Sequence, residues 1–248
     1  MIFARERAEV IADKLKKLMV VRKFELDSWQ EKEGFFLRPE EADRAAESWE
    51  PFDSRLMHWY GPDRHYWFRT VFTVPEEYGG KGLWLRIRTQ IEEWDDAKNP
   101  QFLVFINGEA VQGADMNHRE VLLDRAATAG DTVTVDLQAY SGTLHPEFRL
   151  IADIEEISEP VKDLYYDIQV PLWAMDRMDQ KGKTAIDILT VLNDTISLLD
   201  LRDVYSDEFY RSVEEARAYI GKALYEKKLV TYPRTDSRYL PDDMIPRV

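Results

Sequence analysis

The chain has 248 residues, a formal net charge of −14 and no cysteine. A composition of 44% hydrophobic and 12% aromatic residues is that of a globular protein with a sizeable core, in one large domain or two small ones. The lack of cysteine excludes disulfides, thiolate nucleophiles and cysteine-ligated zinc, and the negative charge argues against general binding to nucleic acid or anionic membranes.

The sequence begins with a predicted helix and continues with a long irregular segment. The start, MIFARERAEV, is charged and lacks the apolar core of a secretory signal, and no stretch reaches the roughly 20 apolar residues of a membrane span. We therefore expect a soluble cytoplasmic protein with no membrane partner. Residues 4–20 predict an amphipathic helix whose apolar stripe is Val10, Ile11, Leu15 and Leu18. Residues 21–64 show little periodicity and predict an ordered, irregular wrap that buries Trp29 and Trp49.

Alternating polar and apolar residues predict a sheet in the middle of the chain. We place its strands at 65–74, 82–91, 101–106, 109–112, 119–123, 131–138 and 147–156. The pair Asn107-Gly108 lies between two apolar runs and predicts a two-residue hairpin. Short strands at this spacing favour a β-sandwich or jelly roll.

The pattern becomes helical after Glu159-Pro160. One stripe recurs at intervals of three and four residues: Val161, Leu164, Tyr165, Ile168 and Leu172. Pro171 should kink that helix or end its first half. A second helix is predicted over 183–201, and a third begins near Ser206, which can cap it. The chain therefore divides into a helix and wrap, a β-sandwich, a helical linker region and an extended tail, at residues 1–50, 51–157, 158–226 and 227–248.

Several long runs carry a resemblance to a known family. They are WYGPDRHYWFRTVFTVPEEYGGKGLWLRI, NPQFLVFINGEAVQGADMNHREVLL, LQAYSGT, VKDLYYDIQVPLWAMDRM and ILTVLNDTISLLDLRD. Over residues 1–226 the chain resembles the N-terminal region of bacterial α-mannosidases of glycoside hydrolase family 38. The resemblance implies an α+β fold, namely an antiparallel β-sandwich of the jelly-roll, galactose-binding-like type with an N-terminal helix and a C-terminal helical segment. It also implies a parent glycosidase that cleaves α-mannosidic bonds with a divalent metal, usually zinc.

The sequence departs from that family where the chemistry would lie. The family's metal ligands and aspartate nucleophile belong to a following α/β barrel, which opens with a His-x-His-x-Asp motif that this sequence lacks. The four histidines are scattered, at His58, His65, His118 and His145. We find no pair of carboxylates to assign to glycosidic cleavage, which needs two of them about 5 Å apart. We therefore expect no catalytic residue, metal or cofactor in this chain, and interpret it as a non-catalytic accessory domain without its barrel.

A second, short resemblance covers the C-terminal end. The segment LYEKKLVTYPRTDSRYLPDDM resembles the active-site segment of type IA DNA topoisomerases, closest to topoisomerase III. The resemblance implies a tyrosine that attacks a DNA phosphate and an arginine that stabilises it, at the positions of Tyr232 and Arg234. That family also needs an acidic metal site in a separate domain, so we expect both residues to be inactive here. We interpret the chain as a chimera or frame-joined fragment with its junction near residues 223–228.

Two polar segments of the sheet region are candidate binding sites. Asn117, His118 and Arg119 form either a sugar-contacting loop or a hydrogen-bond network of purely structural value. Trp94 is a candidate for stacking on a sugar. The carboxylates around it are weak candidates for Ca²⁺, or else form a solvated acidic loop: Glu92, Glu93, Asp95 and Asp96.

Three functions follow from these observations. The first is the accessory domain of an α-mannosidase, which would contact the barrel, or self-associate through an apolar patch on helices 160–226. The second is an autonomous carbohydrate-binding module. The third is a DNA-processing protein, which rests on the tail alone and which the acidic body opposes.

Overall fold

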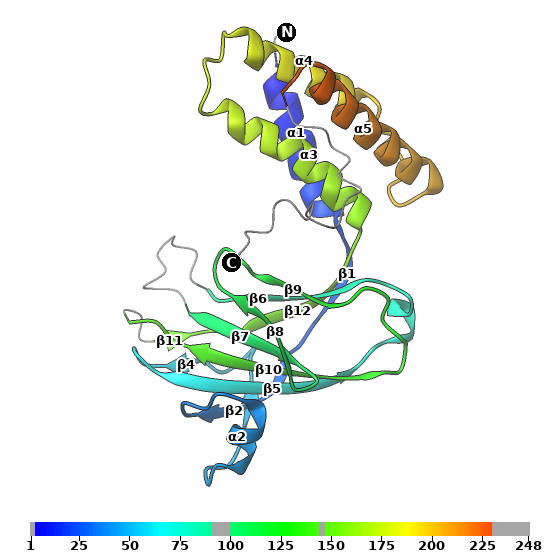
Figure 1. Ribbon diagram of the computed structural model, residues 1–248. Helices are drawn as coiled ribbons and strands as arrows, with labels where there is room; N and C mark the ends of the chain where they lie inside the picture. The colour runs from blue at the N-terminus through cyan, green and yellow to red at the C-terminus, as the bar shows by residue number, and fades with distance from the viewer. Residues whose placement is uncertain (1–2, 91–99, 144–146, 230–248) are drawn as a thin grey trace, which may run out of the picture. The chain divides into compact units, whose positions relative to one another are not determined.

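The computed structural model describes residues 3–90, 100–143 and 147–229. These residues form two compact units, a β-sandwich of residues 20–157 and a helical unit that joins the N-terminal helix to the segment beginning at residue 158 (Figure 1). No helix in the described ranges is long and apolar enough to cross a membrane.

The β-sandwich consists of two antiparallel sheets that face each other (Figure 1). The four-stranded sheet has the order β1-β12-β6-β9, and its strands are Val20–Glu25, Ile151–Ile157, Leu83–Arg88 and Glu120–Asp124. The six-stranded sheet has the order β3-β2-β5-β10-β7-β8, with strands Glu50–Asp53, Ser28–Glu33, His65–Thr73, Thr132–Tyr140, Gln101–Ile106 and Glu109–Ala114. A small separate pair joins β4 (Trp59–Tyr60) to β11 (Glu147–Phe148).

The main core lies between the two sheets. Alternate residues of β6 face it from one side and alternate residues of β10 from the other: Leu83, Leu85 and Ile87, and Val135, Leu137 and Ala139. Trp59 fills one end, with its ring centroid 4.9 Å from that of Phe148 and 5.5 Å from that of Phe68. The expected α+β fold, an antiparallel sandwich with an N-terminal helix and C-terminal helices, is confirmed.

The tight turn at Asn107-Gly108 also forms as predicted. Both residues have positive φ, 50° and 85°, the backbone pattern of a type I′ hairpin turn. Asn107 joins this turn to β10, because its backbone N–H donates to the carbonyl of Thr134 and its Oδ1 accepts from the Thr134 N–H, each at 2.9 Å.

The irregular wrap predicted for residues 21–64 is wrong, because this segment contains β1 to β4 and the short helix α2 (Pro39–Arg44). Strand β1 is an edge strand with one polar side, and β2 buries one residue on each face, Trp29 toward the inter-sheet core and Lys32 on the outer face. Neither alternates cleanly in hydrophobicity. Pairing with β12 and β5 makes them strands, and that context overrides local preference.

Four helices make up the other unit: α1 (Ala4–Leu18), α3 (Glu159–Met175), α4 (Lys183–Ser197) and α5 (Asp207–Glu226). Helix α1 contacts α3 and α4, and α5 contacts the same two helices. Helix α3 continues through Pro171, so the proline does not end it. It also carries three exposed apolar side chains one turn apart, Tyr166, Val170 and Trp173. Self-association through such a stripe stays a prediction.

The stripe predicted for the first helix is wrong at Val10, which is 66% exposed. The residues that α1 buries are spaced mostly four apart and are mainly alanines: Ala4, Ala8, Ala12 and Leu15. Small side chains allow two neighbouring helices to approach closely, so the packing partners selected this face over the one with larger residues.

The expected cap of the last helix is confirmed and gives a first prediction. Ser206 Oγ accepts from the Phe209 backbone N–H at 3.2 Å. Replacing Ser206 with alanine leaves that N–H without its acceptor, so we expect a loss of about 1 kcal/mol in the free energy of unfolding, measured by urea denaturation. Ser206→Asn keeps an acceptor and should retain most of the stability. Equal losses in both variants would contradict the capping role.

Candidate functional site

Only part of the set of predicted site residues falls in the described ranges. Trp94, the acidic residues around it, Tyr232 and Arg234 lie outside them. Asn117, His118 and Arg119 lie together in the loop between β8 and β9.

The loop between β8 and β9 satisfies its own polar groups. Asp115 Oδ1 accepts from the backbone N–H groups of Asn117 and His118, each at 2.7 Å, and lies 3.1 Å from His118 Nδ1. Burial acts to raise the pKa of Asp115, but these hydrogen bonds outweigh it and lower the pKa. Asp115 and Arg119 border a cavity of about 10 Å³. That volume suits about one water molecule and is too small for a sugar ring.

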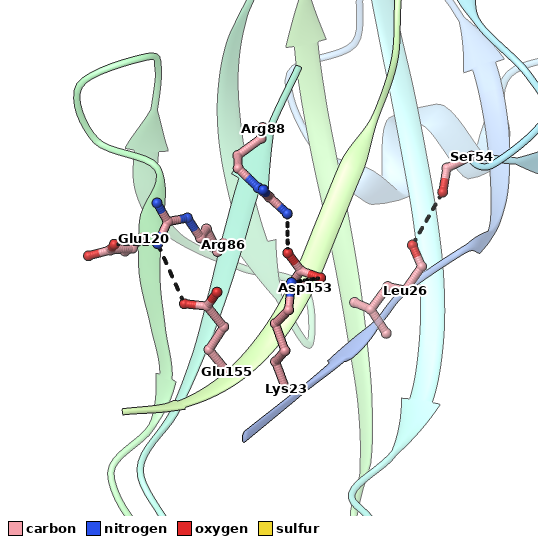
Figure 2. Close-up of polar contacts among 8 residues, drawn as sticks. All are labelled: Lys23, Leu26, Ser54, Arg86, Arg88, Glu120, Asp153 and Glu155. Carbon is pink, nitrogen blue, oxygen red and sulfur yellow. Dashed lines mark hydrogen bonds and ion pairs between the residues drawn. The ribbon is translucent and has the colours of Figure 1, made fainter. Parts of the chain in front are cut away.

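The outer face of the four-stranded sheet carries a lattice of opposite charges (Figure 2). Asp153 of β12 is fully buried, lies 3.3 Å from Lys23 Nζ on β1 and also pairs with Arg88 on β6. Next to it Glu155 is 3% exposed, with its Oε2 3.8 Å from Arg86 Nη1.

The lattice is neutral overall. Arg86 Nη1 also lies 3.3 Å from Glu120 Oε1, so three cations face three carboxylates across four strands. Burial raises the pKa of Glu155; Arg86 opposes the rise, and the carboxylates of Asp153 and Glu120 add to it. A neutral, mutually paired array of this kind braces a sheet and leaves little net charge with which to hold an ionic ligand.

The outer face of the six-stranded sheet is different, because it contains an open groove of about 240 Å³. One row of its floor is made by three residues that pair directly across β5, β10 and β7, namely His65, Tyr140 and Gln101. The next row on the same face contributes Gln138 and Leu103. Because side chains alternate along a strand, all five project away from the inter-sheet core.

Phe35 forms one wall of the groove and is 64% exposed. Its ring stands edge-on to His65, with centroids 4.8 Å apart, and the His65 ring lies 5.1 Å from that of Tyr140. The Gly34 N–H donates to the His65 carbonyl at 2.9 Å, and the side-chain amide of Gln138 donates to the carbonyl of Phe36. The wall is therefore hydrogen-bonded to the floor on both sides of Phe35.

Gly34 is required at the start of this wall. Its φ is +152°, and a Cβ at this position would lie 2.5 Å from the Phe36 ring. A side chain here would displace Phe36 and the wall that follows it.

The segment 34–49, which includes α2, packs on a neighbouring part of this outer face (Figure 1). Under it lie Trp67 and Phe105, both buried against Ala42 of α2. Two cations from the sheet hold the cover in place. Lys32, 3% exposed, donates to the carbonyl of Ala42 at the end of α2, and Arg69 pairs with Asp43 at 2.7 Å.

The phenol of Tyr140 is an additional hydrogen-bonding group in the groove. Its hydroxyl donates to Asp63 Oδ1 at 3.1 Å. Desolvation and this hydrogen bond raise the pKa of Tyr140, so the phenol stays protonated at neutral pH. The groove thus presents aromatic rings beside uncharged donors and acceptors, an arrangement suited to a hydroxylated ring with apolar faces. Among the described residues no group of three or more histidines and carboxylates is placed to hold a metal ion.

Comparison with known proteins gives distant structural similarity only. No family model matches the chain, and no curated protein sequence matches it. Among solved structures it is similar to the β-glucuronidase of Ruminococcus gnavus in complex with D-glucuronic acid, with 14% identity and a TM-score of 0.36 over 56% of this chain and 30% of that one. It is similar to the β-glucuronidase of Lactobacillus rhamnosus with 14% identity and a TM-score of 0.35, over 56% and 29%.

The matched part is less than a third of each β-glucuronidase. At these values the similarity supports no inference about activity. The comparisons therefore add no evidence for either the α-mannosidase or the topoisomerase resemblance.

Sequence reasoning missed the groove. His65, Gln101 and Tyr140 stand far apart in the chain, and each looks like an ordinary outward position of a strand. The alternation along β10 could have indicated the polar face that carries the groove. It places Asp136, Gln138 and Tyr140 on one side of a strand that runs two residues beyond the predicted range 131–138.

The buried Glu155 gives a second prediction. The pKa of Glu155 in the folded state lies above the ordinary 4.5. At pH values between these two pKa values, the folded protein holds a proton that the unfolded chain has released. Its contribution to stability is complete below about pH 4.5 and falls as pH rises through the folded-state pKa. In Glu155→Gln this loss is absent, so the unfolding free energy of the variant minus that of the wild type should rise as pH increases above about 4.5.

Chemical denaturation at a series of pH values measures this difference. Loss of the ion pair with Arg86 changes the free-energy difference by the same amount at every pH, whereas the titration of Glu155 makes the difference depend on pH. Glu226→Gln, at an exposed position of α5, is the matched control for the loss of one carboxylate, and the slope for Glu155→Gln should exceed the slope for this variant. A flat or falling curve for Glu155→Gln would show that burial does not raise this pKa.

Proposed function

We propose that this chain is a carbohydrate-binding domain and that the sugar occupies the groove formed by Phe35, His65, Tyr140 and Gln101. The observation that carries the proposal is the row His65–Tyr140–Gln101, fixed by strand register and open to solvent beside an exposed phenylalanine. A pyranose ring has apolar C–H faces that pack on aromatic side chains, and hydroxyl groups at its edge that bond to amides and phenols.

The charges around the groove favour a neutral sugar. Arg64, next to His65, is paired with Glu33, and Asp63 accepts from Tyr140. These three charges sum to −1, so the rim offers no surplus cation to a uronic acid or a sugar phosphate. A neutral hexose, with mannose as the first choice from the sequence resemblance, fits this chemistry best.

The groove predicts a specific pattern of affinity. A shallow open site of this size should bind a monosaccharide or short oligosaccharide in the millimolar range, about 4 kcal/mol. Tyr140→Ala removes both a ring and a hydroxyl and should weaken binding at least tenfold. Gln101→Ala removes one exposed amide and should weaken binding about fivefold, close to the loss of one hydrogen bond.

Calorimetric titration with mannose, manno-oligosaccharides, glucose and galactose measures these affinities. Trp173→Ala, an exposed aromatic residue of α3, is the matched control and should bind as the wild type does. The proposal is wrong if no neutral sugar releases or absorbs heat at millimolar concentration, or if Tyr140→Ala binds normally.

The finer assignment, an accessory domain of an α-mannosidase without catalytic activity of its own, is part of the same proposal. It is supported by the resemblance over residues 1–226 and by the lining of the groove, whose described residues include aromatic rings and amides and no carboxylate.

Hydrolysis of an aryl α-mannoside tests this assignment. The chain, assayed with added zinc, should give no release of the aryl group above the blank. Turnover that scales with protein concentration, and that persists in Tyr140→Ala, would instead identify an enzyme with its active site elsewhere in the chain.

A further inference from the structure

A second cavity opens between the two sheets, bounded by other residues than those of the groove. Its volume is about 230 Å³. Three core-facing residues of the six-stranded sheet line it, Phe72, Val133 and Ile106, and two residues of the four-stranded sheet close it, Leu83 and Leu123. The cavity lies where the inter-sheet core ends.

The inner wall of this cavity is apolar, whereas polar atoms supply most of the lining surface nearer its mouth. The five residues above, together with Val74 and Ala127, supply hydrocarbon surface, and the Phe72 ring is held by an edge contact with Phe24 at 5.7 Å. Water against this wall finds few hydrogen-bond partners, so an apolar group that displaces it from the wall gains free energy. A cavity of about 150 Å³ lined by similar side chains is large enough for benzene. The space here therefore suits one ring with a short substituent.

The rim of the cavity is polar and acidic. It consists of Asn107, Asp124, Thr128, Asp131 and Thr132. The residues that line the cavity, all in the described ranges, include two carboxylates and no basic side chain. A ligand whose apolar part enters the cavity would place its other end beside Asp124 and Asp131, and that end would be favoured as a cation.

The rim is built on fixed backbone. Val74 donates its N–H to the carbonyl of Asp131 and accepts from the Gly130 N–H, both at 2.9 Å. Asp124 Oδ1 accepts from the Ala126 N–H at 2.9 Å, and Asn107 is bonded twice to Thr134. A preformed rim requires little ordering when a ligand binds.

We propose that this cavity, which we call the inter-sheet pocket, binds a small amphipathic amine, with an aromatic or branched aliphatic body inside and its ammonium group between Asp124 and Asp131. This site is independent of the sugar groove and could operate whether or not the groove binds carbohydrate.

Three probes of similar size and different charge test the assignment on the full chain: benzylamine, benzyl alcohol and benzoate. Titrations followed by amide chemical shifts should give saturable binding of benzylamine, with the largest shifts at Asn107, Leu123 and Thr132. Benzyl alcohol should bind several-fold more weakly and benzoate at least tenfold more weakly. Because the whole protein is acidic, shifts that spread over the surface without saturation, or equal binding of benzylamine and benzoate, would overturn the proposal.

Variants separate the two parts of the pocket. In the double variant Asp124→Asn, Asp131→Asn, both exposed positions, benzylamine should bind no better than benzyl alcohol. Ala127→Leu fills the apolar space and should abolish binding of both, whereas Ala110→Leu, at an exposed strand position, should leave it unchanged. Retained benzylamine binding in a folded Ala127→Leu protein would overturn the proposal. If Ala127→Leu does not fold, the double aspartate variant tests the proposal alone. Tighter binding of benzylamine than of benzyl alcohol to that double variant would refute the proposal.

Discussion

The structure of the sandwich depends on the pairing of β10 with its two neighbours. This strand pairs with β5 over nine residues and with β7 over six, and it lies inside the six-stranded sheet. Its alternation sends Val135, Leu137 and Ala139 into the core and Gln138 and Tyr140 to the outer face. A shift of one residue would exchange these two sets, burying the phenol and exposing the core. The same hydrogen bonds therefore fix both the packing and the proposed sugar groove.

The two outer faces of the sandwich stabilise their buried polar groups in opposite ways. On the four-stranded sheet, charges neutralise one another across strands, with Asp153 held between Lys23 and Arg88. On the six-stranded sheet, Lys32 and Arg69 reach outward to hold the segment 34–49 as an aromatic cover. The first arrangement uses its charges internally. The second arrangement leaves part of the sheet uncovered beside the segment 34–49. The groove lies there, between Phe35 and the row that begins at His65. A binding groove on this face is thus a consequence of where the cover ends.

The parts of the fold that could be predicted are those that local physics determines. Asn107-Gly108 adopts positive φ with little strain, so its hairpin follows from two residues. Ser206 accepts a hydrogen bond from its own helix, and the last helix begins where that cap predicts. Strands β1 and β2 were not predicted, because neither shows clear hydrophobic alternation. Their hydrogen-bond partners, β12 and β5, lie far away in the sequence. Val10 was predicted to be buried because the largest apolar side chains of α1 lie on its face. The sequence of α1 does not show that α3 and α4 pack on its alanines instead.

By itself the sequence determined the class of the molecule: an acidic, cysteine-free α+β protein, with a hairpin-rich sheet followed by helices, because composition, turn residues and side-chain periodicity act over a few neighbouring residues. Only the tertiary structure decided which residues share a surface. It brought His65, Gln101 and Tyr140 into one row, left the Asn117–Arg119 loop with room for about one water, and opened a cavity between the sheets with two aspartates at its rim. The physical reason is that strand register and sheet packing join positions that no local pattern relates.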